Sequence, residues 1–296
     1  MSSILYSELR VGSDTLRFKG TGGKASTDGL VVTDEGVEGW YSTPDVKTSV
    51  SERGQGDGAH DVSETDITYS ARTVTAHCAA VGPGRQSVVE TVRRILRAAH
   101  RLVTFRLVDS SSDTYVTGYA SVAASADWHE RWIGFDLTIV CPRPERLSWR
   151  PWSGQMRAAH VARGGLYYGD KAKGLAYPLS YGVNGQPQRN TVTMTNHGSS
   201  RAYPVFTVNG SFEEPVRLEC SGDGRSYSLE VQSTSGGSAP MVLDSRSRTA
   251  TRGGADASRL LLSRGFPVIE PGGSVTVRLL SAGSGWVDAE WRDTWM

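Results

Sequence analysis

Short segments in which apolar and polar residues alternate dominate the chain. The clearest runs from Ile133 to Cys141, where apolar side chains at the odd positions repeat with the period of a strand that has one buried face. Similar runs cover residues 67–79, 102–108, 115–123, 191–195, 205–208, 227–231 and 274–280. Asp223-Gly224 separates two such segments and predicts a hairpin, because glycine tolerates the positive φ of a tight turn. The pattern therefore predicts an all-β protein.

One segment has helical spacing instead. Ser87 followed by Glu90 has the form of a capping box, in which each side chain binds the backbone amide of the other residue. Apolar residues then recur with the helical period, namely Val88, Val92, Ile95, Leu96 and Ala99. We expect one helix over residues 87–100, with Val92, Ile95 and Leu96 buried against an N-terminal sheet.

The opposite face of this helix carries Arg93, Arg94 and Arg97. No aromatic residues interleave with these arginines, whereas surfaces for single-stranded nucleic acid combine the two. Residues 1–145 carry 15 Lys and Arg against 19 Asp and Glu, a net −4, and residues 146–296 carry 17 against 12, a net +5. Nucleic-acid-binding domains are far more basic. We therefore predict a solvated or interface face and no specific nucleic-acid binding.

Two prolines mark a boundary between domains. Pro142 and Pro144 lack the backbone donor that a ladder needs, so the first sheet is expected to end at Cys141. A chain of 296 residues is long enough for two cores. We expect an N-terminal β-barrel or split sheet over residues 1–145 and a C-terminal β-sandwich over residues 146–296. Residues 147–190, in which aromatic residues are scattered among Gly and Pro, are interpreted as a connector or arm.

Composition adds that the protein is soluble and globular, with 38% hydrophobic and 21% charged residues. No segment approaches the roughly 20 apolar residues that cross a bilayer, and the N-terminus lacks the features of a signal peptide. Folding in a cytosol and no membrane partner are therefore expected. Cys78, Cys141 and Cys220 are few and far apart, which predicts buried free thiols rather than disulfides or a zinc site.

No group of residues predicts catalysis. The six histidines are His60, His77, His100, His129, His160 and His197. None shares a helix face with another histidine or lies at zinc spacing from a cysteine, and no Gly-x-Ser-x-Gly elbow accompanies them. We predict no catalytic, cofactor-binding or metal-binding residue, no cofactor and no enzymatic activity.

The acidic segments also lack the pattern of a known site. Residues 57–61 (DGAHD) lack the alternating oxygen donors and the bidentate Glu of a calcium loop. We interpret them as a turn that leads into a strand from Val62. The adjacent acids Asp34-Glu35 and Glu213-Glu214 point to opposite faces of an extended chain, so they predict exposed loop residues and not a glycosidase pair.

Short motifs are spaced along nearly the whole chain. They are residues 40–47 (WYSTPDVK), 54–59 (GQGDGA), 196–210 (NHGSSRAYPVFTVNG), 243–249 (LDSRSRT) and 291–296 (WRDTWM). In this order they resemble the distal tail (Dit) family, the minor tail proteins of long-tailed phages. We also expect the terminal motif to be docked, because two tryptophans are poorly suited to a terminus that dangles in water.

The resemblance implies a structural role. In this family the N-terminal domain forms a ring, usually a hexamer, at the end of the tail tube, and a galectin-like sandwich projects outward. The ring joins the tube to the tip or baseplate and leaves a channel for DNA. For this chain the resemblance implies a ring-forming domain over residues 1–145 and a virion tail-tip location after assembly in the bacterial cytoplasm. The implied partners are copies of itself, the tail tube protein, tail-associated or baseplate hub proteins and the tape measure protein.

The eight tryptophans leave a second function open. Flat aromatic rings bury the apolar faces of sugars, and Trp286, Trp291 and Trp295 crowd the C-terminal strands. Tryptophan is also enriched in interfaces, and we interpret these three as packing residues. The alternative is a carbohydrate-binding β-sandwich, or a receptor-binding tail protein that recognises host glycans. A β-sandwich hydrolase has almost no residue support.

Overall fold

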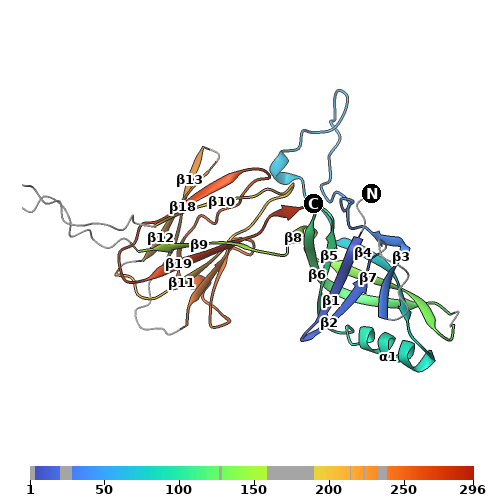
Figure 1. Ribbon diagram of the computed structural model, residues 1–296. Helices are drawn as coiled ribbons and strands as arrows, with labels where there is room; N and C mark the ends of the chain where they lie inside the picture. Colours follow the sequence, from blue (N-terminus) through green and yellow to red (C-terminus); the bar gives the residue numbers. More distant parts are fainter. Residues whose placement is uncertain are drawn as a thin grey trace, which may run out of the picture. The chain divides into compact units, whose positions relative to one another are not determined.

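The computed structural model describes residues 4–20, 29–126, 129–158, 190–213, 215–222, 224–232 and 239–296. The chain divides into two compact units, an N-terminal unit of Met1–Trp149 with Trp295–Met296 and a C-terminal unit of Arg150–Thr294. No described helix is long and apolar enough to cross a membrane. Both units are built from strands, which confirms the predicted all-β class (Figure 1).

The N-terminal unit is a closed barrel. Its strands are β1 (Ile4–Val11), β2 (Asp14–Lys19), β3 (Gly29–Glu38), β4 (Arg72–Val81), β5 (Leu102–Asp109), β6 (Asp113–Ala124) and β7 (Trp132–Cys141). They are hydrogen-bonded in the order β6-β5-β1-β2-β3-β4-β7, and β6 also pairs with β7, which closes the sheet on itself. Strands β2 and β3 run parallel. As predicted, the apolar residues that alternate along β7 are all buried in the barrel core.

The end of this unit lies beyond residue 145. The short strand β8 (Arg146–Ser148) pairs with β6 and, with β20 (Thr294–Trp295), extends the barrel sheet. The guanidinium groups of Arg10 and Arg106 lie over the Trp149 ring, with their Cζ atoms 4.2 and 4.5 Å from its centroid, and the Trp149 and Tyr115 rings meet edge to face. These cation–π contacts hold residues 146–149 on the barrel.

The helix α1 (Arg85–Leu96) begins earlier than predicted. Gly84 is the N-cap, and its carbonyl accepts a hydrogen bond from the Val88 amide at 3.3 Å. The capping box at Ser87 is therefore wrong, since the helix has already started there. The Ser87 carbonyl instead accepts a bond from the Thr91 hydroxyl.

The buried face of α1 is narrower than predicted. Val88, Val92 and Ile95 are buried against the barrel, whereas Leu96 is 51% exposed and Ala99 is also exposed. One residue turns about 100° around a helix, so Leu96 lies off the stripe that ends with Ile95. The helix ends at Leu96 rather than at residue 100, and turns occupy residues 97–100. Arg93, Arg94 and Arg97 are exposed, as expected.

The difference in burial between Ile95 and Leu96 predicts a large loss of stability for one substitution and a small change for its neighbour. Ile95→Ala removes a side chain that is 0% exposed and should destabilise the barrel by about 2–5 kcal/mol. Leu96→Ala removes a half-exposed side chain and should change stability by less than about 0.5 kcal/mol. Thermal denaturation of the two variants measures the difference. Equal losses would mean that α1 is rotated relative to the barrel.

The C-terminal unit is a two-sheet sandwich, which confirms the predicted fold class. The five-stranded sheet contains β10 (Thr191–Thr195), β18 (Ser274–Leu279), β12 (Val216–Gly222), β13 (Arg225–Val231) and β17 (Leu261–Arg264). The six-stranded sheet contains β16 (Ala255–Asp256), β15 (Thr249–Arg252), β14 (Met241–Asp244), β11 (Val205–Asn209), β19 (Trp286–Trp291) and β9 (Trp152–Arg157). One hydrophobic cluster takes residues from both sheets.

The predicted hairpin is confirmed, since β12 and β13 pair antiparallel and Gly224 has φ +72. Asp223 lies outside the described residues, as do the expected loop tip at residues 233–238 and most of the expected connector, residues 159–189. The strand expected from Val62 is wrong. Residues 62–71 contain the short 3-10 helix η1 (Glu64–Asp66), and β4 begins only at Arg72, where the chain enters the barrel.

Candidate assembly surface

Residues 43–70 form an arm that stands clear of the barrel (Figure 1). The arm pairs with itself through isolated bridges between Val46 and Tyr69 and between Glu52 and Ala59. The hydroxyl of Thr48 donates to the carbonyl of Asp66 at 2.7 Å and accepts from the backbone amide of Thr68 at 2.9 Å. Because these contacts are local, the segment keeps a defined conformation without joining the barrel ladder.

The arm exposes apolar side chains. Val46 is 58% exposed, Val50 59%, Val62 39% and Ile67 40%, and none of them belongs to the barrel core. Single exposed apolar residues are ordinary, but several on one projecting segment are typical of a surface that another protein covers. The arm is therefore the strongest candidate for a contact surface among the described residues.

Arg72 anchors the base of the arm. Its side chain is 1% exposed, and its Nη1 donates to the carbonyls of Gly39, Trp40 and Ser42. Its Nε donates to the carbonyl of Pro144 at 2.6 Å. Burial, with a contribution from neighbouring Arg146, lowers the pKa of Arg72 to about 10, so the guanidinium is still charged at neutral pH. One buried cation thus fixes two loops at the start of the arm.

A second anchor joins the arm base to the β5–β6 turn. The Tyr41 hydroxyl donates to Asp109, which also accepts bonds from the backbone amides and hydroxyls of Ser111 and Ser112. Burial raises the pKa of Asp109, but these hydrogen bonds outweigh burial and lower it to about 2. The Tyr41 ring itself is 53% exposed and lies under the guanidinium of Arg146 at 5.4 Å. The charged carboxylate therefore holds Tyr41 at the surface beside the arm.

One histidine lies among acids on the outer face of the barrel. His77 Nδ1 is 2.8 Å from Asp136 and 3.3 Å from Glu35, and its Nε2 is 3.7 Å from Glu38. Burial lowers the pKa of His77, but the hydrogen bond to Asp136 and the three acidic charges prevail and raise it. The arrangement favours a protonated histidine.

The His77 cluster predicts a pH dependence. A histidine whose folded pKa lies above the unfolded value of about 6.5 stabilises the fold below that value and loses this contribution as pH rises through the folded pKa. The stability of the barrel should therefore fall on going from about pH 6 to about pH 8. His77→Gln should flatten this slope in thermal denaturation. A slope that is unchanged in this variant would assign the dependence to another group.

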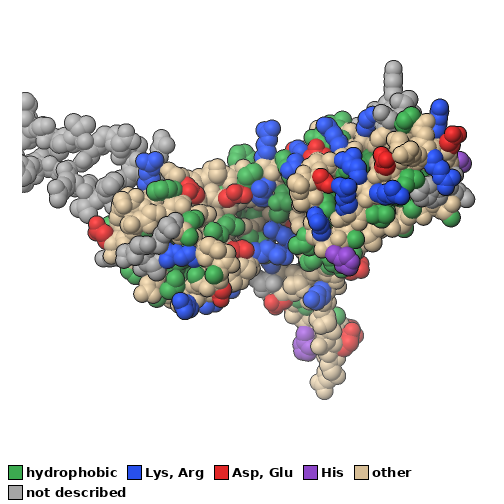
Figure 2. Space-filling model, turned by 90° about the horizontal axis from the view of Figure 1, so that it is seen from below, with side chains coloured by type: hydrophobic (Ala, Val, Ile, Leu, Met, Phe, Trp, Pro, Cys, Tyr) green, Lys and Arg blue, Asp and Glu red, His purple; other side chains and the backbone are tan. Residues whose placement is uncertain are grey.

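Figure 2 views the N-terminal unit from the side of α1, where Lys and Arg side chains gather. The exposed arginines of this helix and of the turn after it are Arg85, Arg93, Arg94, Arg97 and Arg101. On this face Arg97 lies 3.3 Å from Asp14 in an ion pair whose two side chains are both largely exposed. The face is a cationic surface, and the exposure of Arg93, Arg94 and Arg97 agrees with the solvated or interface face expected for them.

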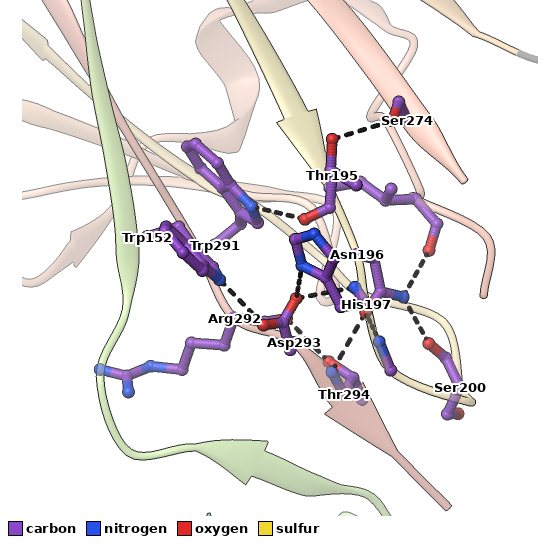
Figure 3. Close-up of polar contacts among 12 residues, drawn as sticks. Trp152, Thr195, Asn196, His197, Ser200, Ser274, Trp291, Arg292, Asp293 and Thr294 are labelled. Carbon is purple, nitrogen blue, oxygen red and sulfur yellow. Dashed lines mark hydrogen bonds and ion pairs between the residues drawn. The ribbon is translucent and has the colours of Figure 1, made fainter. Parts of the chain in front are cut away.

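Residues of the motifs at 196–210 and 291–296 are joined by hydrogen bonds around Asn196 and Asp293 (Figure 3). We call this group of contacts the clasp, and it fixes the chain end of the C-terminal unit. Asn196 is fully buried, and its Nδ2 donates to the carbonyls of Ser200 and Ile269. Its Oδ1 accepts from the amides of Gly198 at 3.0 Å and Thr294 at 3.2 Å. A Cβ on Gly198 would collide with the backbone of Thr294, so this position requires glycine.

Asp293 holds the outer side of the same clasp. Its carboxylate accepts from the His197 amide at 2.8 Å and from the Trp152 indole at 2.9 Å, and it lies 3.2 Å from the His197 ring (Figure 3). Trp291 is 8% exposed and donates to the carbonyl of Thr195 at 2.9 Å. The terminal motif is therefore docked, as predicted, and Trp291 is a packing residue. Trp286, which we also expected to pack, is instead 38% exposed and lies outside the buried core.

The motif at residues 243–249 is also structural. It forms the turn between β14 and β15, where Asp244 Oδ1 accepts from the Arg246 amide at 2.8 Å and Arg248 has φ 55. The motif at residues 40–47 forms the arm base, and residues 54–59 lie at the far end of the arm. The sequence motifs thus secure turns and chain ends rather than form a pocket.

The described residues contain no cluster of His, Cys, Asp and Glu that could hold a metal. All three cysteines are buried, as predicted, and burial raises the pKa of Cys141 to about 11 and that of Cys220 to about 12. Protonated, buried thiols are poor nucleophiles. His160 lies outside the described residues, and the clasp explains His197 without chemistry.

No protein-family model matches the chain, and no curated protein matches its sequence. Among solved structures, it is similar to the Dit (gp 19.1) protein of SPP1, described as a paradigm of the hub adsorption apparatus in phages that infect Gram-positive bacteria. The two are 11% identical, with a TM-score of 0.60 over 98% of this chain and 99% of that chain. A chain of the phage p2 baseplate in its activated conformation with Sr is also 11% identical, with a TM-score of 0.51 over 96% and 97%. Over nearly its whole length, therefore, the chain has the all-β fold of a phage distal tail protein.

Proposed function

We propose that this chain is a structural adaptor of the tail tip of a long-tailed phage. The observation that carries the proposal is the likeness to the SPP1 Dit protein across both units and nearly the full length of both chains. A shared fold alone does not fix a function, but the motifs that resemble the Dit family lie at the arm base, the arm, one turn and the clasp. The role of such an adaptor is structural, and we expect it to have no enzymatic activity.

The adaptor acts as a ring, with six copies as the expected number. A ring needs two different faces of each subunit to meet, and the arm supplies an apolar surface for one of them. Its other partners are the tail tube protein on one side and the tail-associated or baseplate hub proteins on the other. The tape measure protein is a further expected contact in the channel. The complex assembles in the bacterial cytoplasm and remains at the virion tail tip.

DNA passes through the ring without binding to it. The excess of acids in residues 1–145, a net −4, is repeated in every copy around a ring. Acidic walls repel phosphates and prevent the strong, salt-dependent binding that counterion release would drive. We propose that acids outnumber bases on the inner wall and that Arg93, Arg94 and Arg97 face away from it. Tight, salt-sensitive DNA binding by purified rings would contradict this arrangement.

Mass measurement and negative-stain imaging of the purified protein test the ring. The wild type is expected to form rings with an open centre, and Val46→Asp with Val50→Asp should leave monomers, because charges cannot be buried in an apolar contact. Leu262→Asp is the matched control, since Leu262 is 56% exposed on the C-terminal unit. The control should still form rings. A wild type that stays monomeric, and that virion imaging places outside any ring, would overturn the proposal.

A further inference from the structure

One outer face of the sandwich carries a compact group of polar and aromatic side chains. It lies on neighbouring strands β9, β19 and β11, where Gln155 is opposite Asp288 and Arg157 is opposite Trp286. Asn209 is opposite Trp286 on the other side. Side chains alternate along a strand, and the intervening residues Met156, Val208 and Val287 are buried in the core. The group of five therefore points away from the core.

Hydrogen bonds hold this group around one carboxylate. Asp288 Oδ1 accepts from Gln155 at 2.8 Å, and its Oδ2 accepts from Asn209 at 3.0 Å and from the Trp286 indole at 3.1 Å. Gln155 in turn accepts from Arg157 Nε at 3.2 Å. The indole of Trp286 is thus fixed in orientation although its side chain is 38% exposed. Such fixed aromatic rings are typical of binding surfaces rather than of solvated faces.

A hollow of about 380 Å³ opens beside Trp286. Besides Trp286, it is lined by Gln155, Arg157, Ala158 and the turn Gly283–Gly285. Within this turn Gly285 packs directly on the ring of Phe212, where a Cβ would collide. This volume lies in the range of sites for small ligands. The terminal nitrogens of Arg157 have no partner among the described residues and are available beside the hollow.

We propose that this face binds a neutral saccharide, with one sugar ring seated against Trp286. The indole covers the apolar C–H face of the ring, while Asp288 accepts from hydroxyl groups and Arg157 and Gln155 donate to them. The charges of Arg157 and Asp288 cancel, so the site favours a neutral sugar over an anionic one. The site belongs to the C-terminal unit and goes beyond the ring adaptor. The same protein then both joins the tail and contacts surface sugars.

Isothermal titration of the full-length protein with a defined panel tests the site. The panel contains galactose, glucose, N-acetylglucosamine, rhamnose, lactose and maltose as neutral probes and glycerol phosphate as an anionic probe. At least one neutral sugar should bind, and Trp286→Ala should weaken that binding by about tenfold or more. Arg157→Met should also weaken it, because it removes the hydroxyl donors and keeps the length of the side chain. Trp132→Ala, at a tryptophan 45% exposed on the barrel, is the matched control and should bind as the wild type does.

Three results would overturn the site: no neutral probe binds, only glycerol phosphate binds, or Trp286→Ala binds as tightly as the control. Ring formation measured on the same variants separates this proposal from the adaptor, because Trp286→Ala should assemble normally. Sugar binding by a protein that forms no ring would support the site while contradicting the adaptor. Rings that bind none of the neutral sugars would support the adaptor and contradict the sugar site.

Discussion

Replacing Arg72 with methionine should destabilise the N-terminal barrel by about 3–5 kcal/mol. The guanidinium is buried and donates to the carbonyls of Gly39, Trp40, Ser42 and Pro144. Methionine fills similar space but donates nothing, so these carbonyl oxygens, which are buried or partly buried, lose their donor. Each unsatisfied group costs about 1–3 kcal/mol.

The buried charge itself opposes this stabilisation but does not cancel it. The lowering of the Arg72 pKa from its ordinary value to about 10 corresponds to a penalty of about 3 kcal/mol for the charged form. Hydrogen bonds from a charged donor contribute about 1.5–3 kcal/mol each, and this side chain makes several. Arg72→Lys should therefore also destabilise strongly. It keeps the charge but loses the planar fork that reaches two loops at once.

Hydrogen exchange measured by mass spectrometry reports the barrel separately from the sandwich. Faster exchange is expected in β4, in β7 and at the arm base of Arg72→Met, with the sandwich unchanged. Arg94→Met is the control, because Arg94 is exposed on α1. If both variants exchanged alike, the contacts of Arg72 would contribute nothing to stability. Loss of the anchor should also disorder the arm and reduce ring formation.

The pattern of alternation predicted most strands because a barrel and a sandwich each bury one face of every strand. It predicted β7 residue by residue and placed β5, β6, β10, β11 and β18 closely. The same pattern contained a signal for Arg72 that the sequence interpretation missed. Side chains alternate along β4, and Arg72 is on the same inward-facing side of the strand as Val74, Ala76 and Cys78. A charged residue at an inward position needs buried partners, and the carbonyls of the arm base meet that need.

Other features could not be predicted because they depend on tertiary packing. The strand expected from Val62 fails because strand formation needs a paired neighbour. Residues 62–70 lie on the arm, where Tyr69 makes only an isolated bridge, and ladder pairing with β3 and β7 begins with β4 at Arg72. Leu96 has the right spacing for burial, yet it lies about 100° around the helix from the buried Ile95 and so falls outside the stripe that faces the barrel. The sequence left sugar binding only as a general alternative function and did not locate a site for it. Its members come from β9, β19 and β11, which are distant in sequence and adjacent only in the folded sheet.

Removing the amide of Asn196 should destabilise the sandwich by about 2–4 kcal/mol. Asn196→Ala leaves the amides of Gly198 and Thr294 and the carbonyls of Ser200 and Ile269 without this partner. Because the residue is fully buried, water cannot readily replace the lost bonds. The docked segment at residues 291–296 should become susceptible to proteolysis. His197→Ala is the control, since the neighbouring side chain is largely exposed and should cost little.

Asn196→Asp sharpens the test because it changes only the donor. An ionised carboxylate would face the carbonyls of Ser200 and Ile269, so burial and repulsion should raise its pKa. A folded-state pKa above the unfolded value means that the folded state binds more protons, and stability should rise as pH falls. Urea unfolding of the sandwich should therefore show partial recovery of Asn196→Asp below about pH 5, which Asn196→Ala lacks. If the two variants responded identically to pH, the assignment of the Asn196 amide as a buried donor would be wrong, and with it the account of how the chain end is held.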